Sequence, residues 1–242
     1  MRDHGGCWLA AGLVVALASS RWPAAGQPSA RADQIVALCA KAMGGMETIR
    51  ALRTLRIGIV YPDHGAAPIF CEIRRPNKIR TRITVFDGTR GCLLKDPTGQ
   101  TGASFRPRLI PDDELKDFEV DIAWFIPAFF DYPYEHLGSE VAGGTEMHKL
   151  AVSLPLGAKM TYYVDGDAFL VRRAASDIVV GGNDYHMERA FSDFEPAGGI
   201  LFPRSFVYPG RQDGTQTATV ASIEVNIPLS DDDFRIPVDV QE

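Results

Sequence analysis

The sequence predicts an α+β protein that is mainly antiparallel β, with a single sheet of about ten strands. Three observations predict this class. Apolar residues recur at helical spacing over residues 33–52. After Thr54 they alternate with polar residues in short runs that turn residues separate. Over residues 111–133 the alternation stops, and an aromatic-rich stretch predicts a second helical region.

The first 32 residues have the pattern of an export signal. Arg2 is followed by an apolar run of 11 residues at positions 8–18. That run is too short for a transmembrane helix but typical of a signal peptide. We expect cleavage after Gly26 or Ala32, with an uncleaved N-terminal anchor as the alternative.

Charge and composition exclude several function classes. The chain has 25 Lys and Arg against 31 Asp and Glu, a net charge of −6. Residues 1–32 carry three arginines and one aspartate, so their removal leaves 210 residues at −8. Without a clustered positive excess, nucleic-acid binding is disfavoured. We expect residues 33–242 to form one domain, a monomer in the periplasm.

Three cysteines follow the signal: Cys39, Cys71 and Cys92. An odd number leaves at least one free thiol. Cys71 and Cys92 fall on predicted strands that a third strand separates, about 10 Å apart and too far for a disulfide. We expect three reduced, buried thiols that act as small apolar side chains, with a reactive nucleophile as the alternative.

The helical region at the start has two parts. Asp33 suits an N-cap, and apolar residues follow at helical spacing up to Met43. Gly44 and Gly45 interrupt this helix, and residues 46–52 resume as a second short one.

The strand regions flank the middle segment. Three alternating runs are typical of an antiparallel meander with one apolar face, at residues 55–61, 69–74 and 79–85. The middle segment begins with the acidic residues 112–114, which suit a helix N-terminus, and Pro127 should end or kink that helix. Six further runs then predict strands, at residues 147–154, 159–164, 169–175, 183–192, 204–208 and 217–225.

Motifs for catalysis or metal binding are weak. His186 and Glu188 share one face of a predicted strand, but a metal site needs a third or fourth ligand. The acidic triplets 112–114 and 231–233 lack the spacing of a calcium loop. We therefore expect no metal, no cofactor and no catalytic residue. The alternative is an enzyme acting on a hydrophobic or aromatic small molecule, with His186, Glu188 or Tyr162 as its polar groups.

The apolar face of the sheet needs a cover. A short helix and an aromatic segment would cover it incompletely and leave an apolar cavity, the kind of site that binds hydrophobic ligands. The residues expected to line this cavity are Ile57, Ile59, Cys71, Ile73, Ile83, Met160, Tyr162 and Val164. The residues expected to form a lid over it are Trp124, Phe125, Phe129 and Phe130. The alternative is that all twelve side chains pack a solid core.

Six sequence segments occur in an order and at spacings that resemble a known family. These are an Ala-Met-Gly-Gly-Met region within 33–56, Arg-Arg-Pro-Asn-Lys-Ile-Arg at 74–80, Phe-Asp-Gly-Thr-Arg-Gly at 86–91, Tyr-Val-Asp-Gly at 163–166, and the segments 191–203 and 223–237. The chain resembles the periplasmic outer-membrane lipoprotein-sorting proteins, the LolA/LolB-like family. In that family, Trp usually stands after the Asp-Gly turn at the position where this chain has Cys92.

The resemblance implies an incomplete antiparallel barrel, a half-barrel whose concave face helices cover. It implies a non-enzymatic periplasmic carrier that holds the acyl chains of a lipid or lipoprotein. An inner-membrane exporter or an outer-membrane acceptor would be its partner. An envelope module that docks another protein through its apolar face is a further alternative.

Overall fold

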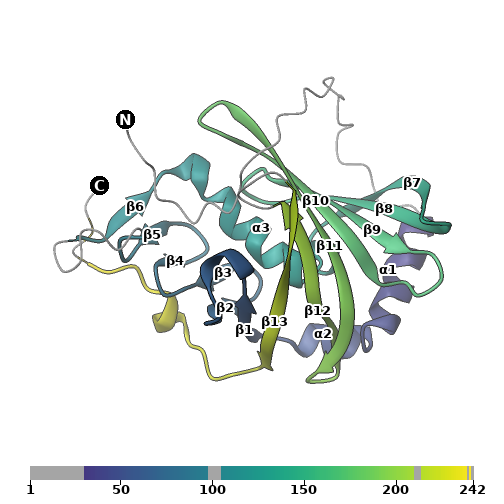
Figure 1. The fold of residues 1–242 in the computed structure, drawn as a ribbon, viewed down its shortest axis with the longest axis horizontal. Coiled ribbons are helices and arrows are strands. Elements are labelled where there is room, and N and C mark those ends of the chain that lie inside the picture. Colours follow the sequence, from purple (N-terminus) through teal and green to yellow (C-terminus); the bar gives the residue numbers. More distant parts are fainter. Residues whose placement is uncertain (1–29, 98–104, 210–213, 239, 241–242) are drawn as a thin grey trace.

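The computed structural model describes residues 30–97, 105–209, 214–238 and 240 (Figure 1). The expected export signal lies outside these residues except for its last three positions, which begin helix α1. The helices are α1 (Ala30–Ala42), α2 (Met46–Ala51) and α3 (Lys116–Phe125), with 3-10 helices η1 (Pro62–His64), η3 (Asp112–Glu114), η4 (Ala128–Phe130) and η5 (Asp231–Phe234).

The strands are β1 (Thr54–Val60), β2 (Ile69–Arg74), β3 (Lys78–Arg80), β4 (Thr84–Phe86), β5 (Gly91–Leu93), β6 (Arg108–Ile110), β7 (Tyr134–Ala142), β8 (Thr145–Ser153), β9 (Lys159–Asp165), β10 (Val171–Val180), β11 (Asn183–Ala197), β12 (Ile200–Pro209) and β13 (Thr215–Val225). All pair antiparallel in one open sheet, in the order β6-β5-β4-β3-β2-β1-β13-β12-β11-β10-β9-β8-β7. The predicted class, α+β and mainly antiparallel with an open sheet, is confirmed.

The described residues contain thirteen strands, more than the expected ten or so. The predicted strand 79–85 is divided, because the chain bends at Arg82 and Ile83 between β3 and β4. Strand β6 has only three residues, too few to show alternation. In β7 the register shifts between His136 and Ser139, where Gly138 has a φ of 91°, and this bulge breaks the period of two.

The strand order determines where the middle segment lies. The first and last strands, β1 and β13, pair at the centre, whereas the consecutive strands β6 and β7 form opposite edges. The connection between them, residues 111–133, must therefore cross one face of the sheet. We call it the crossing segment. Its helix α3 lies within the curve of the sheet (Figure 1).

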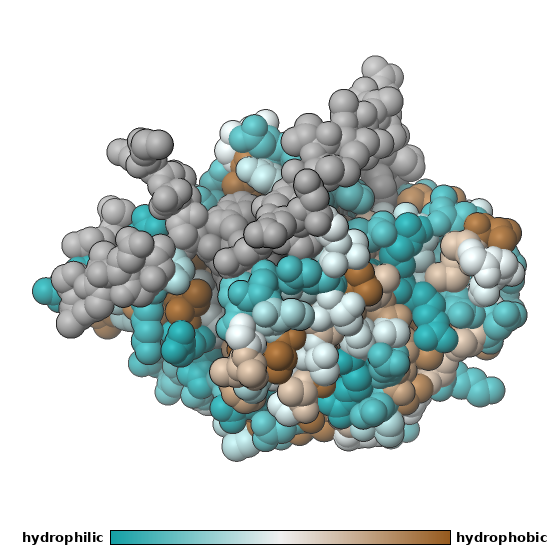
Figure 2. All heavy atoms as spheres, in the orientation of Figure 1, coloured by the Kyte–Doolittle hydropathy of each residue, from teal (hydrophilic) through white to brown (hydrophobic). Residues whose placement is uncertain are grey.

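The concave face holds the main hydrophobic core. Its cross-strand neighbours follow the registers Ile57↔Cys71 and Ala174↔Tyr162, and α1 contributes Ile35 and other apolar residues. A second, smaller cluster of Val85, Cys92, Phe234 and Ile236 joins β4 and β5 to the C-terminal segment. On the face seen in Figure 2, hydrophilic side chains predominate and apolar ones are scattered among them.

At the Gly44-Gly45 break between α1 and α2, the backbone lies close to the backbone of Gly199. Gly44 has a φ of 119°, and a Cβ added there would lie 2.0 Å from the carbonyl oxygen of Gly199. The Leu201 amide also donates to the Met43 carbonyl over 2.9 Å. Only glycine fits such a position, so this motif joins the N-terminal helices to the turn between β11 and β12.

The expected start of the first helix is wrong by one turn. Helix α1 begins at Ala30, so Asp33 lies in its first turn instead of at the N-cap. Ala32 is fully buried. Cleavage after Ala32 would remove part of α1, whereas cleavage after Gly26 would leave the helix whole.

Candidate functional site

The candidate site is the contact between the concave face and the crossing segment. Helix α3 is buried on most of its sides, as is typical of a helix enclosed by protein. It ends at Phe125, as the Pro127 signal predicted, and η4 follows directly. Of the predicted lid, Trp124, Phe125 and Phe129 are buried in the main core and Phe130 packs against it.

The structure brings most of the predicted lining residues together with these aromatics. Six are buried in the same core cluster, and Cys71 is half-buried against it: Ile57, Ile59, Cys71, Ile73, Met160, Tyr162 and Val164. Ile83 is the exception, because it lies half-buried in the bend between β3 and β4. Contact of these residues with a ligand stays a prediction.

Tyr162 connects the sheet to the crossing segment at the point where its helix breaks. A helical carbonyl normally accepts from the amide four residues later, but the partner of Ala123 would be Pro127, which has no N–H. The Tyr162 hydroxyl donates to the Ala123 carbonyl over 3.1 Å and accepts from the Ala128 amide over 2.9 Å. Burial raises the pKa of Tyr162, which keeps the hydroxyl protonated. One side chain thus satisfies the backbone on both sides of the break.

A second connection is an ion pair at the far end of the segment. Arg75, directly after β2, contacts Asp131 over 2.5 Å, and their side chains are 9% and 21% exposed. The same guanidinium donates to the carbonyls of Ile49 and, over 3.2 Å, Leu52. Arg75 therefore joins the end of β2, helix α2 and the crossing segment.

The start of the crossing segment is held by the turn between β10 and β11. The Lys116 ammonium donates to the Val179 carbonyl, and the Gly181 amide donates to the Asp113 carboxylate, each over 2.8 Å. Burial first, and then repulsion from Asp121 and Glu114, raises the pKa of Asp117 to about 7.

Arg189 of β11 lies on the concave side, against α3. Its guanidinium carbon is 4.7 Å from the ring centroid of Trp124 and 4.9 Å from that of Phe206. Its ion-pair partner is Asp121, at 3.9 Å. Arg189 therefore contacts the crossing segment both by cation–π stacking on Trp124 and by its ion pair with Asp121.

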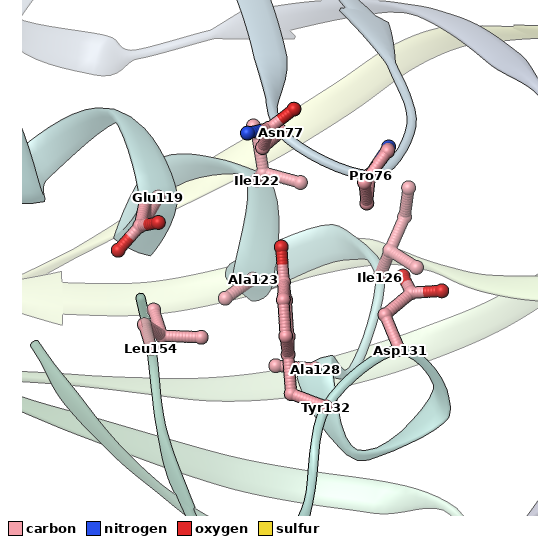
Figure 3. A pocket seen from close by; sticks show the side chains of 10 residues that line it. All are labelled: Pro76, Asn77, Glu119, Ile122, Ala123, Ile126, Ala128, Asp131, Tyr132 and Leu154. Carbon is pink, nitrogen blue, oxygen red and sulfur yellow. The ribbon is translucent and has the colours of Figure 1, made fainter. Parts of the chain in front are cut away.

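A small pocket lies beside α3, where the crossing segment meets the turns after β2 and β8. Its volume is about 10 Å³, roughly the space of one water molecule. Its ten lining residues, which include Glu119, Ile122 and Tyr132, are shown in Figure 3. Glu119 is buried and accepts from the Leu156 amide over 2.9 Å, and burial raises its pKa. Side chains of the sheet and of the crossing segment belong to one core cluster.

The polar residues considered for an enzyme do not meet at this site. His186 and Glu188 pair with Asp177 and Arg173 on the convex face, whereas Tyr162 faces the concave side. His186 and Glu188 therefore do not lie near the expected cavity, whereas Tyr162 does, because neighbouring residues of a strand point to opposite faces. The described part of the chain contains no cluster of three or more potential metal ligands.

The cysteines and the acidic triplet near the C-terminus have structural surroundings. Cys39, Cys71 and Cys92 are not joined in disulfides, and burial raises the pKa of Cys39 to about 12. Asp231 pairs with Arg74 and Lys78 on the convex side. The triplet therefore holds the C-terminal segment to the sheet.

Arg75 and Arg189 are the residues that sequence reasoning missed. Arg75 follows the last residue of β2, where alternation no longer fixes its direction. Arg189 lies two residues from both Met187 and Phe191 in β11, so it shares their concave face. Its charge, however, is typical of a residue that faces solvent.

No family model matches the chain, and no curated protein matches its sequence. A LolA superfamily protein from Nitrosomonas europaea has a similar structure, with 12% identity, 79% of this chain and 96% of that chain covered, and a TM-score of 0.49. An outer membrane lipoprotein-sorting protein domain from Vibrio parahaemolyticus has 11% identity, 83% and 94% coverage, and a TM-score of 0.46. A DUF1329 family protein from Desulfovibrio piger has 14% identity, 84% and 96% coverage, and a TM-score of 0.44.

These structural neighbours include LolA superfamily and lipoprotein-sorting domains. Among the described residues, no helix has the length and apolar character needed to cross a membrane.

Proposed function

We propose that this protein is a periplasmic carrier that holds the acyl chains of a lipid or lipoprotein against the concave face of its open sheet. The observation that carries the proposal is the way in which the apolar concave face is covered. The apolar face is covered by helices α1 and α2 and by one long connection, residues 111–133, which leaves one sheet edge and returns to the other. Such a cover can move without the loss of any strand pairing.

The energies of the closed and loaded states are comparable. A chain of about 15 methylene groups gains roughly 12 kcal/mol when it is fully buried. The four aromatic side chains of the predicted lid lose roughly 6–12 kcal/mol if they leave the core, at about 1.5–3 kcal/mol each. An acyl chain can therefore replace the aromatics, and the empty protein closes on itself instead of exposing an apolar groove.

The polar connections of the crossing segment are few and local. They are the hydroxyl of Tyr162, the ion pair of Arg75 with Asp131, and the contacts to the end of β10 and the turn after it. Glu119 also accepts from the Leu156 amide, and Asp121 pairs with Arg189. Each can break without disturbing the sheet ladder. They therefore set the stability of the closed state independently of the strand pairing.

Native mass spectrometry of the exported protein, together with uptake of a fluorescent fatty acid by delipidated protein, tests the proposal. We expect bound lipid in the first measurement and saturable uptake in the second, which unlabelled fatty acid abolishes. Consistently ligand-free protein that takes up no fatty acid would refute the carrier function. If such protein co-purified stably with an envelope component, it would be an interaction module.

A further inference from the structure

Arg189 is a charged residue on the mainly apolar concave face. Its flanking residues on the same side of β11, Met187 and Phe191, both pack on the main core. The register Ala174↔Arg189 places it beside a fully buried alanine of β10. Its side chain is 14% exposed, so only part of the guanidinium reaches solvent.

The guanidinium has hydrogen-bonding capacity that the closed state does not use. It carries five N–H donors in a planar fork that matches a carboxylate or a phosphate. Its contacts are the rings of Trp124 and Phe206 and the Asp121 carboxylate, whose oxygen is 3.9 Å away. That distance exceeds a hydrogen bond. Within the described parts of the chain, no acceptor bonds this guanidinium.

Two more polar groups with unused capacity lie on this side of the sheet. The Trp124 ring nitrogen and the Ser176 hydroxyl are buried and have no hydrogen-bond partner among the described residues. Ser176 pairs with Met187, so it is the diagonal neighbour of Arg189, and such positions lie about 7–8 Å apart. The Trp124 ring lies under the guanidinium itself. Unsatisfied buried donors are costly and are normally paired.

We propose that Arg189, with Ser176, binds the anionic head group of a lipid whose acyl chain lies on the concave face, in place of the Trp124 ring. The inference rests on the proposed carrier function and adds the ligand class, a carboxylate or phosphate attached to an acyl chain. The head group takes the place of Asp121 on the guanidinium. Binding of the head group thus removes an ionic contact that holds α3, which couples recognition of the ligand to opening of the crossing segment.

Paired ligands of equal chain length test this assignment. In a competition assay, dodecanoate, dodecyl phosphate and neutral dodecanol are each titrated against a neutral fluorescent probe bound to the delipidated protein. We expect the two anions to bind roughly tenfold more tightly than dodecanol, the scale of one charge-assisted contact. Acetate and inorganic phosphate should not displace the probe, which separates a lipid head group from a free anion.

Three variants locate the contact. R189M should lower anion affinity roughly tenfold and leave dodecanol unchanged. R173M is the matched control, because Arg173 also stacks on an aromatic ring and pairs with carboxylates, but on the convex face. It should change neither affinity. D121N should raise the ratio of anion to dodecanol affinity several-fold, since it removes the competing carboxylate. Loosening of α3 alone would strengthen both ligands equally and leave this ratio unchanged.

The outcomes separate the two proposals. If dodecanoate and dodecanol bind wild-type protein equally well, the head-group assignment is wrong and the carrier function stands. If neither ligand binds, both proposals fail. If R189M does not fold, D121N decides, and an unchanged ratio of anion to dodecanol affinity in D121N overturns the assignment.

Discussion

Replacing Tyr162 with phenylalanine should loosen the crossing segment while the ring remains in the core. The change removes the hydroxyl that serves the Ala123 carbonyl and the Ala128 amide. Because Pro127 has no N–H, no helical donor can replace it for Ala123. Two hydrogen bonds at about 1 kcal/mol each give an expected loss of about 2 kcal/mol. That loss raises the population of an opened state roughly 30-fold.

Amide hydrogen exchange of residues 123–130, measured with urea unfolding, checks this magnitude. In Y162F we expect roughly 30-fold faster exchange in this segment, with a rate that is insensitive to low urea, as in a local opening. Y163F is the control, because Tyr163 lies next in β9 but stacks under Arg173 on the convex face. Its effect should stay within about 0.5 kcal/mol. A wild-type exchange rate for the Ala128 amide in Y162F would refute the reasoning.

Three further changes test other parts of the site. R75M should lower the free energy of unfolding by about 3 kcal/mol in urea, because it leaves the Asp131 carboxylate without its partner; a loss below about 1 kcal/mol would contradict the connection. Asp117 has a pKa of about 7 in the folded protein against about 3.9 when unfolded. Its contribution to stability is complete below about pH 4 and is lost as the pH rises through 7, so D117N should gain stability relative to wild type between pH 5 and pH 8 in urea titrations. A constant difference would show that Asp117 does not titrate in this way. Bound fatty acid should slow the alkylation of Cys71, on the concave side, and leave that of Cys92, in the separate cluster, unchanged; equal protection of both would argue for general stabilisation instead.

The sequence was informative where a period persisted over several residues. Alternation predicted the long strands and placed Tyr162 on the concave face, and the break at Pro127 ended α3 where expected. Strand β6 has only three residues, which are too few for an alternation of apolar and polar residues to be recognised. Arg189 obeyed the alternation, but its charge outweighed its position in the pattern. At Arg189 the charge of the residue indicates solvent, whereas its position in the alternation indicates the buried face. Such conflicts between local signals are expected at functional or strained sites.

The strand order also explains a correct expectation that composition alone could not justify. An aromatic-rich segment could have packed anywhere, yet it covers the concave face. The reason is topological, since β6 and β7 are consecutive in the chain and lie at opposite edges of the sheet. Only the pairing of β1 with β13, between residues far apart in the chain, creates that separation. No local pattern in the sequence encodes this pairing.

The unpaired edge strands of the sheet, β6 and β7, affect the size of the cargo that the proposed carrier could hold. A closed barrel has a radius fixed by its strand number and shear. Here β6 and β7 lie at opposite ends of the molecule, and neither is hydrogen-bonded to the other (Figure 1). The curvature of the sheet can therefore relax while every ladder bond is kept. In the proposed carrier, the interior would be an adjustable volume, and one scaffold could hold a single acyl chain or several.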